Sequence, residues 1–242
     1  MLREIAAVYR KEMRAYFASP IPYFVIALFA GYMAYRFFMQ DETAFFIYDR
    51  ADMYRGFFFG FETVLVILVP LIGMRLWASE YNAGTIETLV TLPVRTSSLV
   101  IGKFLGGWTL VLVCFLATAP IPITVSYLGD LDWGPVHGGY LGGFLFCGAM
   151  LALATWVSSL TRHQILAAVL TGAIGFVFIA MYTWSTKLGS VAGPISEQLS
   201  LVSHYQAMGR GVIDLRDVLY FASFMVFFLY LNVQSVENRR YQ

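Results

Sequence analysis

Long apolar runs alternate with short polar stretches along this chain, and their lengths indicate the fold class. A helix needs about 20 apolar residues to cross a bilayer, and because lipid cannot satisfy irregular backbone, such runs should be helical. The third, fourth and sixth runs contain no Asp, Glu, Lys or Arg, which argues against a water-soluble helical core. We therefore predict an all-α integral membrane protein with six transmembrane helices. They cover residues 20–39, 56–78, 104–128, 138–160, 164–184 and 218–236.

The first nineteen residues have a helical pattern of their own. Six apolar side chains fall within an arc of about 120° on a helical wheel; they are Leu2, Ile5, Tyr9, Met13, Tyr16 and Phe17. This pattern predicts an amphipathic helix lying in the membrane interface over residues 1–19, with Pro20 and Pro22 at the turn into the membrane. The helix is either a lipid anchor or an elbow that also contacts a cytosolic partner through Arg10, Lys11 and Arg14. Acids in this leader argue against a cleaved signal peptide.

Composition and charge agree with a membrane protein and orient it. Hydrophobic residues make up 59% of the 242 positions and charged residues only 13%, where soluble domains carry about a quarter. A net charge of +1 gives no electrostatic case for nucleic-acid binding. The two termini, the polar break 80–104 with Arg75 just before it, and the turn 158–163 together hold ten basic and five acidic residues, whereas the remaining segments hold six and ten. By the positive-inside rule, both termini and this break are expected in the cytosol.

The sequence carries no recognisable catalytic device. It has no GxxxxGK(S/T) phosphate loop, no HExxH or GxSxG motif, and no cysteines or histidines at metal-ligand spacing. Cys114 and Cys147 fall inside spans, where they are expected to act as small packing residues. We therefore expect no metal, no cofactor and no catalytic residue in this chain, so any energy must come from a partner.

Two features inside the spans are candidates for a pathway or an interface. Glu62 lies within the second span, where a charge is costly. It either lines a cavity, pairs across an interface with Arg36 or Arg55, or reaches solvent at the outer side of the membrane. Pro120 and Pro122 should kink or break the third span near its outer end.

The polar break 80–104 predicts a short helix over residues 84–93. Thr85 is placed as its N-cap, and Glu87 in the first turn suits the helix dipole. Ile86, Leu89 and Val90 form one apolar strip, and Pro93 ends the helix. An amphipathic helix of this kind fits a groove on another protein.

The stretch RLWASEYNAGTIETLVTLPVRTSSLVIGKFLGG, residues 75–107, resembles the signature of ABC-2-type permeases, the membrane subunits of a class of ABC transporters. The matching positions are Arg75, Glu80, Gly84, Thr85, Glu87, Leu89, Pro93, Gly102 and Lys103. The chain departs from that signature at Ser79, Tyr81 and Asn82. SSLTRHQI (158–165) and HYQAMGRGVIDLRDVLYF (204–221) are similar to the gliding-motility-associated subgroup, and more distantly to permeases of nitrous-oxide-reductase maturation.

The resemblance implies a half-transporter in a bacterial cytoplasmic (inner) membrane, with residues 1–242 forming one transmembrane domain. Its implied partners are two copies of a cytosolic ABC ATPase, which bind ATP and Mg, a second copy of this chain or a paralogue, membrane lipid, and a periplasmic auxiliary protein. Segment 84–93 would be the coupling helix that enters a groove of the ATPase. Residues implied in ATPase coupling are Arg75, Glu80, Gly84, Thr85, Ile86, Glu87, Leu89, Val90 and Pro93. Segment 187–217 would form short re-entrant helices, the alternative being a surface loop.

Two functions follow from the resemblance. In the first, the chain is the permease subunit of an exporter. In the second, it uses the same coupling to drive an extracytoplasmic partner by force, without moving a solute. An intramembrane enzyme or a channel is disfavoured because site residues are absent.

Overall fold

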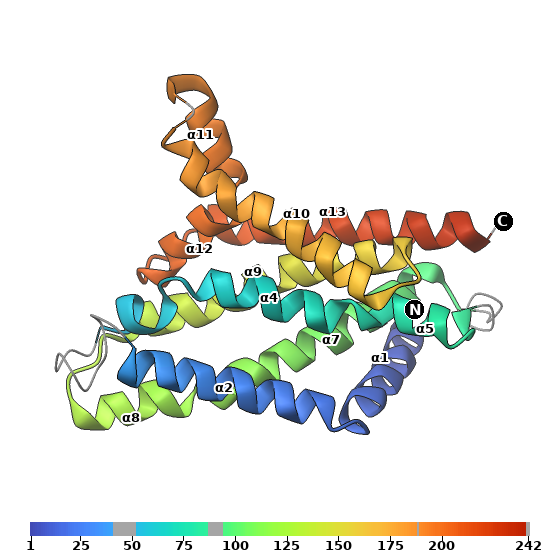
Figure 1. The fold of residues 1–242 in the computed structure, drawn as a ribbon, viewed down its shortest axis with the longest axis horizontal. Helices are drawn as coiled ribbons and strands as arrows, with labels where there is room; N and C mark the ends of the chain where they lie inside the picture. Colours follow the sequence, from blue (N-terminus) through green and yellow to red (C-terminus); the bar gives the residue numbers. More distant parts are fainter. Residues whose placement is uncertain (41–51, 87–93, 188, 241–242) are drawn as a thin grey trace.

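Six long apolar helices form the body of the protein (Figure 1). The computed structural model describes residues 1–40, 52–86, 94–187 and 189–240, and these ranges contain helices and no strands. The predicted all-helical class with six candidate spans is confirmed. The elements are α1 (Leu2–Phe17), α2 (Ile21–Met39), the π-helix η2 (Tyr54–Phe58), α4 (Phe61–Gly73), α5 (Arg75–Asn82), α7 (Thr96–Thr118), α8 (Pro120–Leu128), α9 (Trp133–Leu160), α10 (Gln164–Ser185), α11 (Gly189–Leu199), α12 (Leu201–Gly209) and α13 (Leu215–Arg240).

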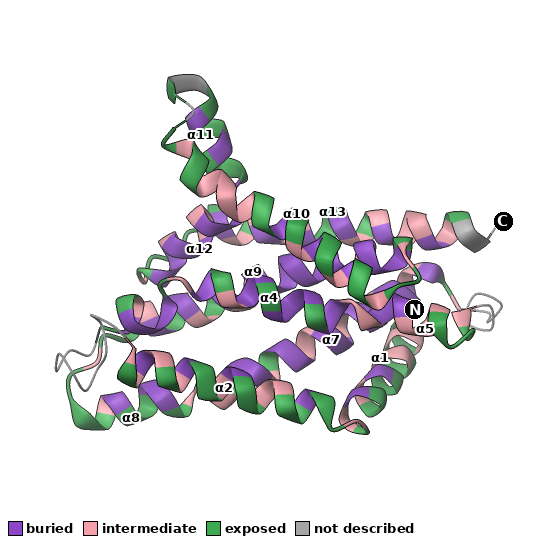
Figure 2. Cartoon of the chain, in the orientation of Figure 1, coloured by how far each residue is buried: buried purple, intermediate pink, exposed green. Residues whose placement is uncertain are grey.

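Helix α9 lies at the centre of the bundle and contacts α4, α7, α10, α12 and α13. It is buried along most of its length (Figure 2). Glycines let its neighbours approach: a Cβ on Gly138 would lie 2.0 Å from the Met208 carbonyl oxygen, and one on Gly143 would lie 2.9 Å from Phe115. Close packing through small residues is the usual way in which helices associate in lipid.

Both termini lie at the same end of the bundle, which we call the termini end (Figure 1). Helix α1 crosses the direction of the spans at this end and packs against α7. Its contact face differs from the predicted apolar strip, because Val8 and Glu12 lie against Gly102 and Gly106 while Leu2 is 83% exposed.

The helix bounds around the polar break differ from the predicted ones. The predicted second span, 56–78, begins within η2; after a left-handed turn at Gly60 (φ 75°) the helix starts at Phe61. It then continues through α5 to Asn82, with a one-residue interruption at Met74. Helix α7 starts at Thr96 and not at 104, so the segment between α5 and α7 covers residues 83–95.

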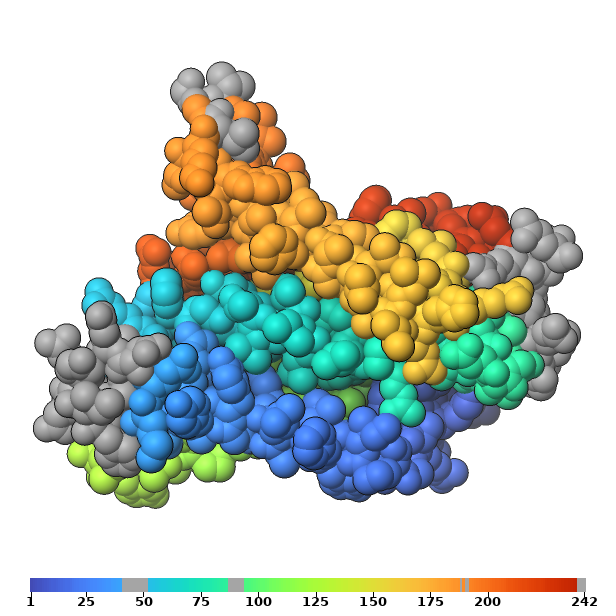
Figure 3. All heavy atoms as spheres, in the orientation of Figure 1, coloured from blue at the N-terminus to red at the C-terminus, as the bar shows by residue number. Residues whose placement is uncertain are grey.

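The opposite end of the bundle contains α8, α11 and α12. The predicted interruption of the third span at its paired prolines is confirmed, because α7 ends at Thr118 and α8 begins at Pro120. Two short helices, α11 and α12, occupy the predicted segment 187–217. Helix α12 packs on α9, while α11 packs mainly on α10 and projects from the body (Figures 1 and 3).

Candidate functional site

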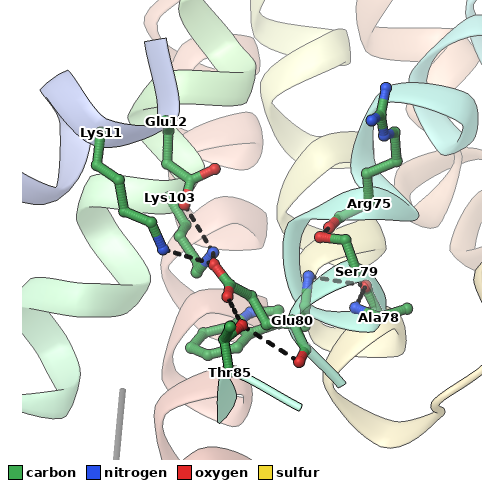
Figure 4. Close-up of polar contacts among 10 residues, drawn as sticks. Lys11, Glu12, Arg75, Ala78, Ser79, Glu80, Thr85 and Lys103 are labelled. Carbon is green, nitrogen blue, oxygen red and sulfur yellow. Dashed lines mark hydrogen bonds and ion pairs between the residues drawn. The ribbon is translucent and has the colours of Figure 1, made fainter. Parts of the chain in front are cut away.

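A fully buried lysine joins three helices at the termini end. Lys103 of α7 is 1% exposed, and its Nζ donates to Glu12 Oε1 of α1 at 2.7 Å and to Glu80 Oε1 of α5 at 3.2 Å (Figure 4). The Nζ also lies 5.3 Å from the centre of the Trp77 ring. A buried charge is tolerated only when it is paired, and here two carboxylates and an aromatic face surround one cation.

Glu80 extends this cluster towards the surface. Its Oε1 also accepts from Lys11 Nζ of α1 at 2.7 Å, and its Oε2 accepts from the Thr85 hydroxyl. Lys11, Glu12, Glu80 and Lys103 thus form an alternating chain of two cations and two anions, which we call the ion network (Figure 4). Because the four charges cancel, the network can be buried between helices. Helix α5 can therefore continue past Glu80, and α7 can begin before Lys103.

Glycine packing brings α1 close enough to complete the network. A Cβ on Gly102 would lie 2.7 Å from the Val8 side chain, and one on Gly106 would lie 2.9 Å from the Glu12 Cβ. The two glycines flank Lys103 on the face of α7 that meets α1. They place the Glu12 carboxylate beside the buried ammonium group.

Helix α5 ends at Asn82 in a Schellman turn. The Thr85 amide donates to the Glu80 carbonyl at 3.0 Å and the Gly84 amide to the Tyr81 carbonyl at 3.2 Å. Gly84 has φ 69°, which favours glycine. Gly84 and Thr85, the first two residues of the predicted helix 84–93, lie in this turn, and Ile86 is helical. Glu87, Leu89, Val90 and Pro93 lie outside the described residues, so the helix itself stays a prediction.

Ser158 of α9 holds the interruption between α4 and α5. Its Oγ accepts from the amides of Trp77 (3.2 Å) and Ala78 (3.1 Å) and donates to the Met74 carbonyl at 2.9 Å. These backbone groups lie next to the interruption at Met74, and the Ser158 hydroxyl gives them a hydrogen-bond partner there. Next to it, the Ser159 carbonyl accepts from the Tyr81 hydroxyl at 3.4 Å. The central helix is thereby tied to the helix that carries Glu80.

A family model described as an ABC-2 family transporter protein matches residues 6–238, nearly the whole chain. The chain belongs to the ABC-2 transporter family. A search of curated proteins gives no match. Membrane subunits of this family lack the ATPase domain and work with an ABC ATPase subunit. This protein is thus a multi-pass membrane subunit of an ABC-2 transporter.

Two of the ABC-2 signature residues, Glu80 and Lys103, meet in the ion network together with Lys11 of the predicted elbow. Thr85 bonds to Glu80, Gly84 forms the turn after α5, and Gly102 packs against α1. The Arg75 side chain points away from the ion network (Figure 4). Arg10 and Arg14 are exposed on α1.

Sequence reasoning missed one member of the network, Glu12. An acidic side chain on an amphipathic helix is usually solvated. The only sequence signal for the burial of Glu12 was its position four residues from both Val8 and Tyr16, which puts the three side chains on one face of the helix. In the ABC-2 subunit Glu12 is 8% exposed because it faces Lys103.

At the opposite end of the ABC-2 subunit, Glu62 has neither of its predicted ion-pair partners. It is 7% exposed, and its Oε2 has no hydrogen-bond partner among the described residues. Arg36 instead donates to the Phe59 carbonyl, and Arg55 lies 3.8 Å from Asp52. Neither ion pair forms among the described residues of this chain, and the role of Glu62 in a pathway or an interface stays a prediction. Of the two prolines, Pro122 is buried and Pro120 exposed.

Proposed function

We propose that the chain is the permease subunit of an ABC-2 exporter in a bacterial cytoplasmic membrane, with the termini end in the cytosol. Two membrane subunits, either two copies or one copy and a paralogue, would pair with two ATPase subunits that bind ATP and Mg. The excess of basic residues in the segments at the termini end supports this orientation.

One observation carries the coupling mechanism: Glu80 is bonded to both α1 and α7 and stands four residues before Gly84, where the chain turns out of the bundle. A force applied to segment 84–93 would reach Glu80 through the Schellman turn and the Thr85 hydroxyl. Lys103 would then transmit this force to α7, and Lys11 and Glu12 would transmit it to α1. Because these ion pairs are short and share the Lys103 ammonium group and the Glu80 carboxylate, the ends of α1, α5 and α7 should move together.

The experiment uses the full chain purified with its ATPase subunit in lipid nanodiscs. Glu87→Arg should weaken ATPase binding, because it reverses a charge in segment 84–93, and Gly84→Pro should lower ATP hydrolysis by disrupting the turn. Glu197→Arg makes the same charge change on an exposed site at the opposite end and should leave both quantities unchanged. Normal binding and hydrolysis in both test variants would overturn the coupling assignment.

A second candidate function is force transmission to an extracytoplasmic partner, as the gliding-motility-like motifs suggest. Helix α11 favours it, because it projects from the body (Figure 3) and its Ile195 and Leu199 are exposed. Reconstituted vesicles separate the two functions. Exporter activity predicts ATP-dependent flux of a solute, whereas force transmission predicts ATP turnover without flux and capture of a periplasmic protein through α11.

A further inference from the structure

A groove of about 340 Å³ opens where α1, α2, α4, α7 and α10 meet at the termini end. Most of its lining is apolar, with Val25, Leu71 and Leu110 from three different helices. Its polar lining comes from Tyr16, Arg75 and Gln164. The groove therefore combines an apolar trough with a small polar group of side chains.

A smaller cavity of about 60 Å³ adjoins the groove. Tyr16 and Arg75 line both spaces, and Glu12, Ala15 and Ser79 complete the smaller one. An apolar trough thus leads to a polar chamber, and the tyrosine and the arginine stand at the junction.

Two polar groups at this junction lack partners. Tyr16 is 8% exposed, and its hydroxyl has no hydrogen-bond partner among the described residues. The half-buried Arg75 makes no ion pair within the described ranges, and its side chain extends away from the ion network (Figure 4). The one carboxylate that lines the chamber, Glu12, is already paired with Lys103 at 2.7 Å. A buried hydroxyl and a cation without a protein partner are costly unless a ligand satisfies them.

We propose that this junction binds an anionic phospholipid from the leaflet at the termini end. The phosphate accepts hydrogen bonds from the Arg75 guanidinium and the Tyr16 hydroxyl, and one acyl chain lies in the trough. Arginine suits this role because its planar group can bind phosphate through two parallel hydrogen bonds. Basic pockets between transmembrane helices bind lipid headgroups in this way.

The position of the groove favours a lipid over a soluble anion. Helix α1 crosses the ends of the spans here (Figure 1). In a bilayer, the ends of such spans are expected where the headgroups meet the acyl region. A free phosphate ion would satisfy the two polar groups but would leave the trough empty. A phospholipid fills both parts, so apolar burial adds to charge pairing.

Native mass spectrometry of the full chain in detergent tests the proposal, with phosphatidylglycerol, phosphatidylcholine and inorganic phosphate as probes. Phosphatidylglycerol should be retained in preference to phosphatidylcholine. Arg75→Gln should lower its affinity about tenfold or more, which is the loss expected for a charge-assisted hydrogen bond. Arg14→Gln removes an exposed arginine from the same end and should leave retention unchanged.

Tyr16→Phe serves as the second variant, because it removes only one oxygen and keeps the ring that packs at the junction. It should also weaken retention of phosphatidylglycerol, with an unchanged melting temperature as evidence of folding. Equal retention of the two lipids, equal loss in Arg75→Gln and Arg14→Gln, or displacement of phosphatidylglycerol by inorganic phosphate would each overturn the proposal. None of these measurements involves the ATPase subunit, so their outcome is independent of the coupling mechanism.

Discussion

The two ends of the bundle are held together by different chemistry. At the termini end, four charged side chains join α1, α5 and α7 through ion pairs of 2.7–3.2 Å. At the opposite end, aromatic rings pack against one another, with ring centres 4.8 Å apart for Phe57 and Phe58 and 5.4 Å for Phe61 and Phe115. Charge pairs demand particular partners, whereas packed rings contribute through area and shape.

Hydrogen bonds at the aromatic end go mainly to backbone carbonyls. The Tyr205 hydroxyl donates to the Phe58 carbonyl at 3.0 Å, and the Tyr220 hydroxyl to the Leu199 carbonyl at 2.7 Å. His204 lies between Asp217 (2.7 Å) and the Gln198 carbonyl (3.1 Å), so it links α12 to α11 and α13. Losing any one of these bonds leaves the rings packed. The ion network instead depends on one buried cation, Lys103, which pairs with both Glu12 and Glu80. Loss of that residue would leave a buried carboxylate unpaired, which makes the termini end the more fragile of the two.

The largest effect is expected from Lys103→Met. The change leaves Glu12 buried without its cation, so the free energy of unfolding should fall by about 3–5 kcal/mol. Denaturant unfolding in mixed micelles measures this loss. The double variant Lys103→Met/Glu12→Leu removes both charges and should recover much of the stability. A single variant as stable as the unchanged protein would contradict the comparison between the two ends.

A smaller effect is expected at the aromatic end from Tyr205→Phe. The ring remains in place, but the Phe58 carbonyl loses its donor in a buried site, so about 1–2 kcal/mol should be lost. The same unfolding assay measures it. Tyr127→Phe is the matched control, because Tyr127 is 86% exposed and should be neutral. A loss as large as that of Lys103→Met would show that hydrogen bonds, and not ring packing, hold this end.

The apolar pattern was sufficient to predict the six helices, because lipid leaves a long apolar run few other structures. The ion network was only partly predictable. Glu80, Thr85 and Lys11 were expected to act in coupling, but Glu12 was not, since its burial depends on where Lys103 lies in space. The partner of Arg36 could not be predicted for the same reason: next to the left-handed turn at Gly60, Arg36 donates to the Phe59 carbonyl and not to Glu62. Contacts between helices, unlike the helices themselves, are set by packing that one sequence does not reveal.

The smallest effect is expected from Lys11→Met, which tests how far the fragility of the termini end extends. Lys11 is 51% exposed, and Glu80 keeps its contact with Lys103 when Lys11 is removed. An exposed ion pair contributes about 0–1 kcal/mol and is screened by salt. The loss should therefore stay below about 1 kcal/mol in the unfolding assay and shrink further at high salt, whereas the loss for Lys103→Met should persist. A salt-insensitive loss of about 3 kcal/mol would mean that water does not reach Lys11, and that all four charges form one buried unit.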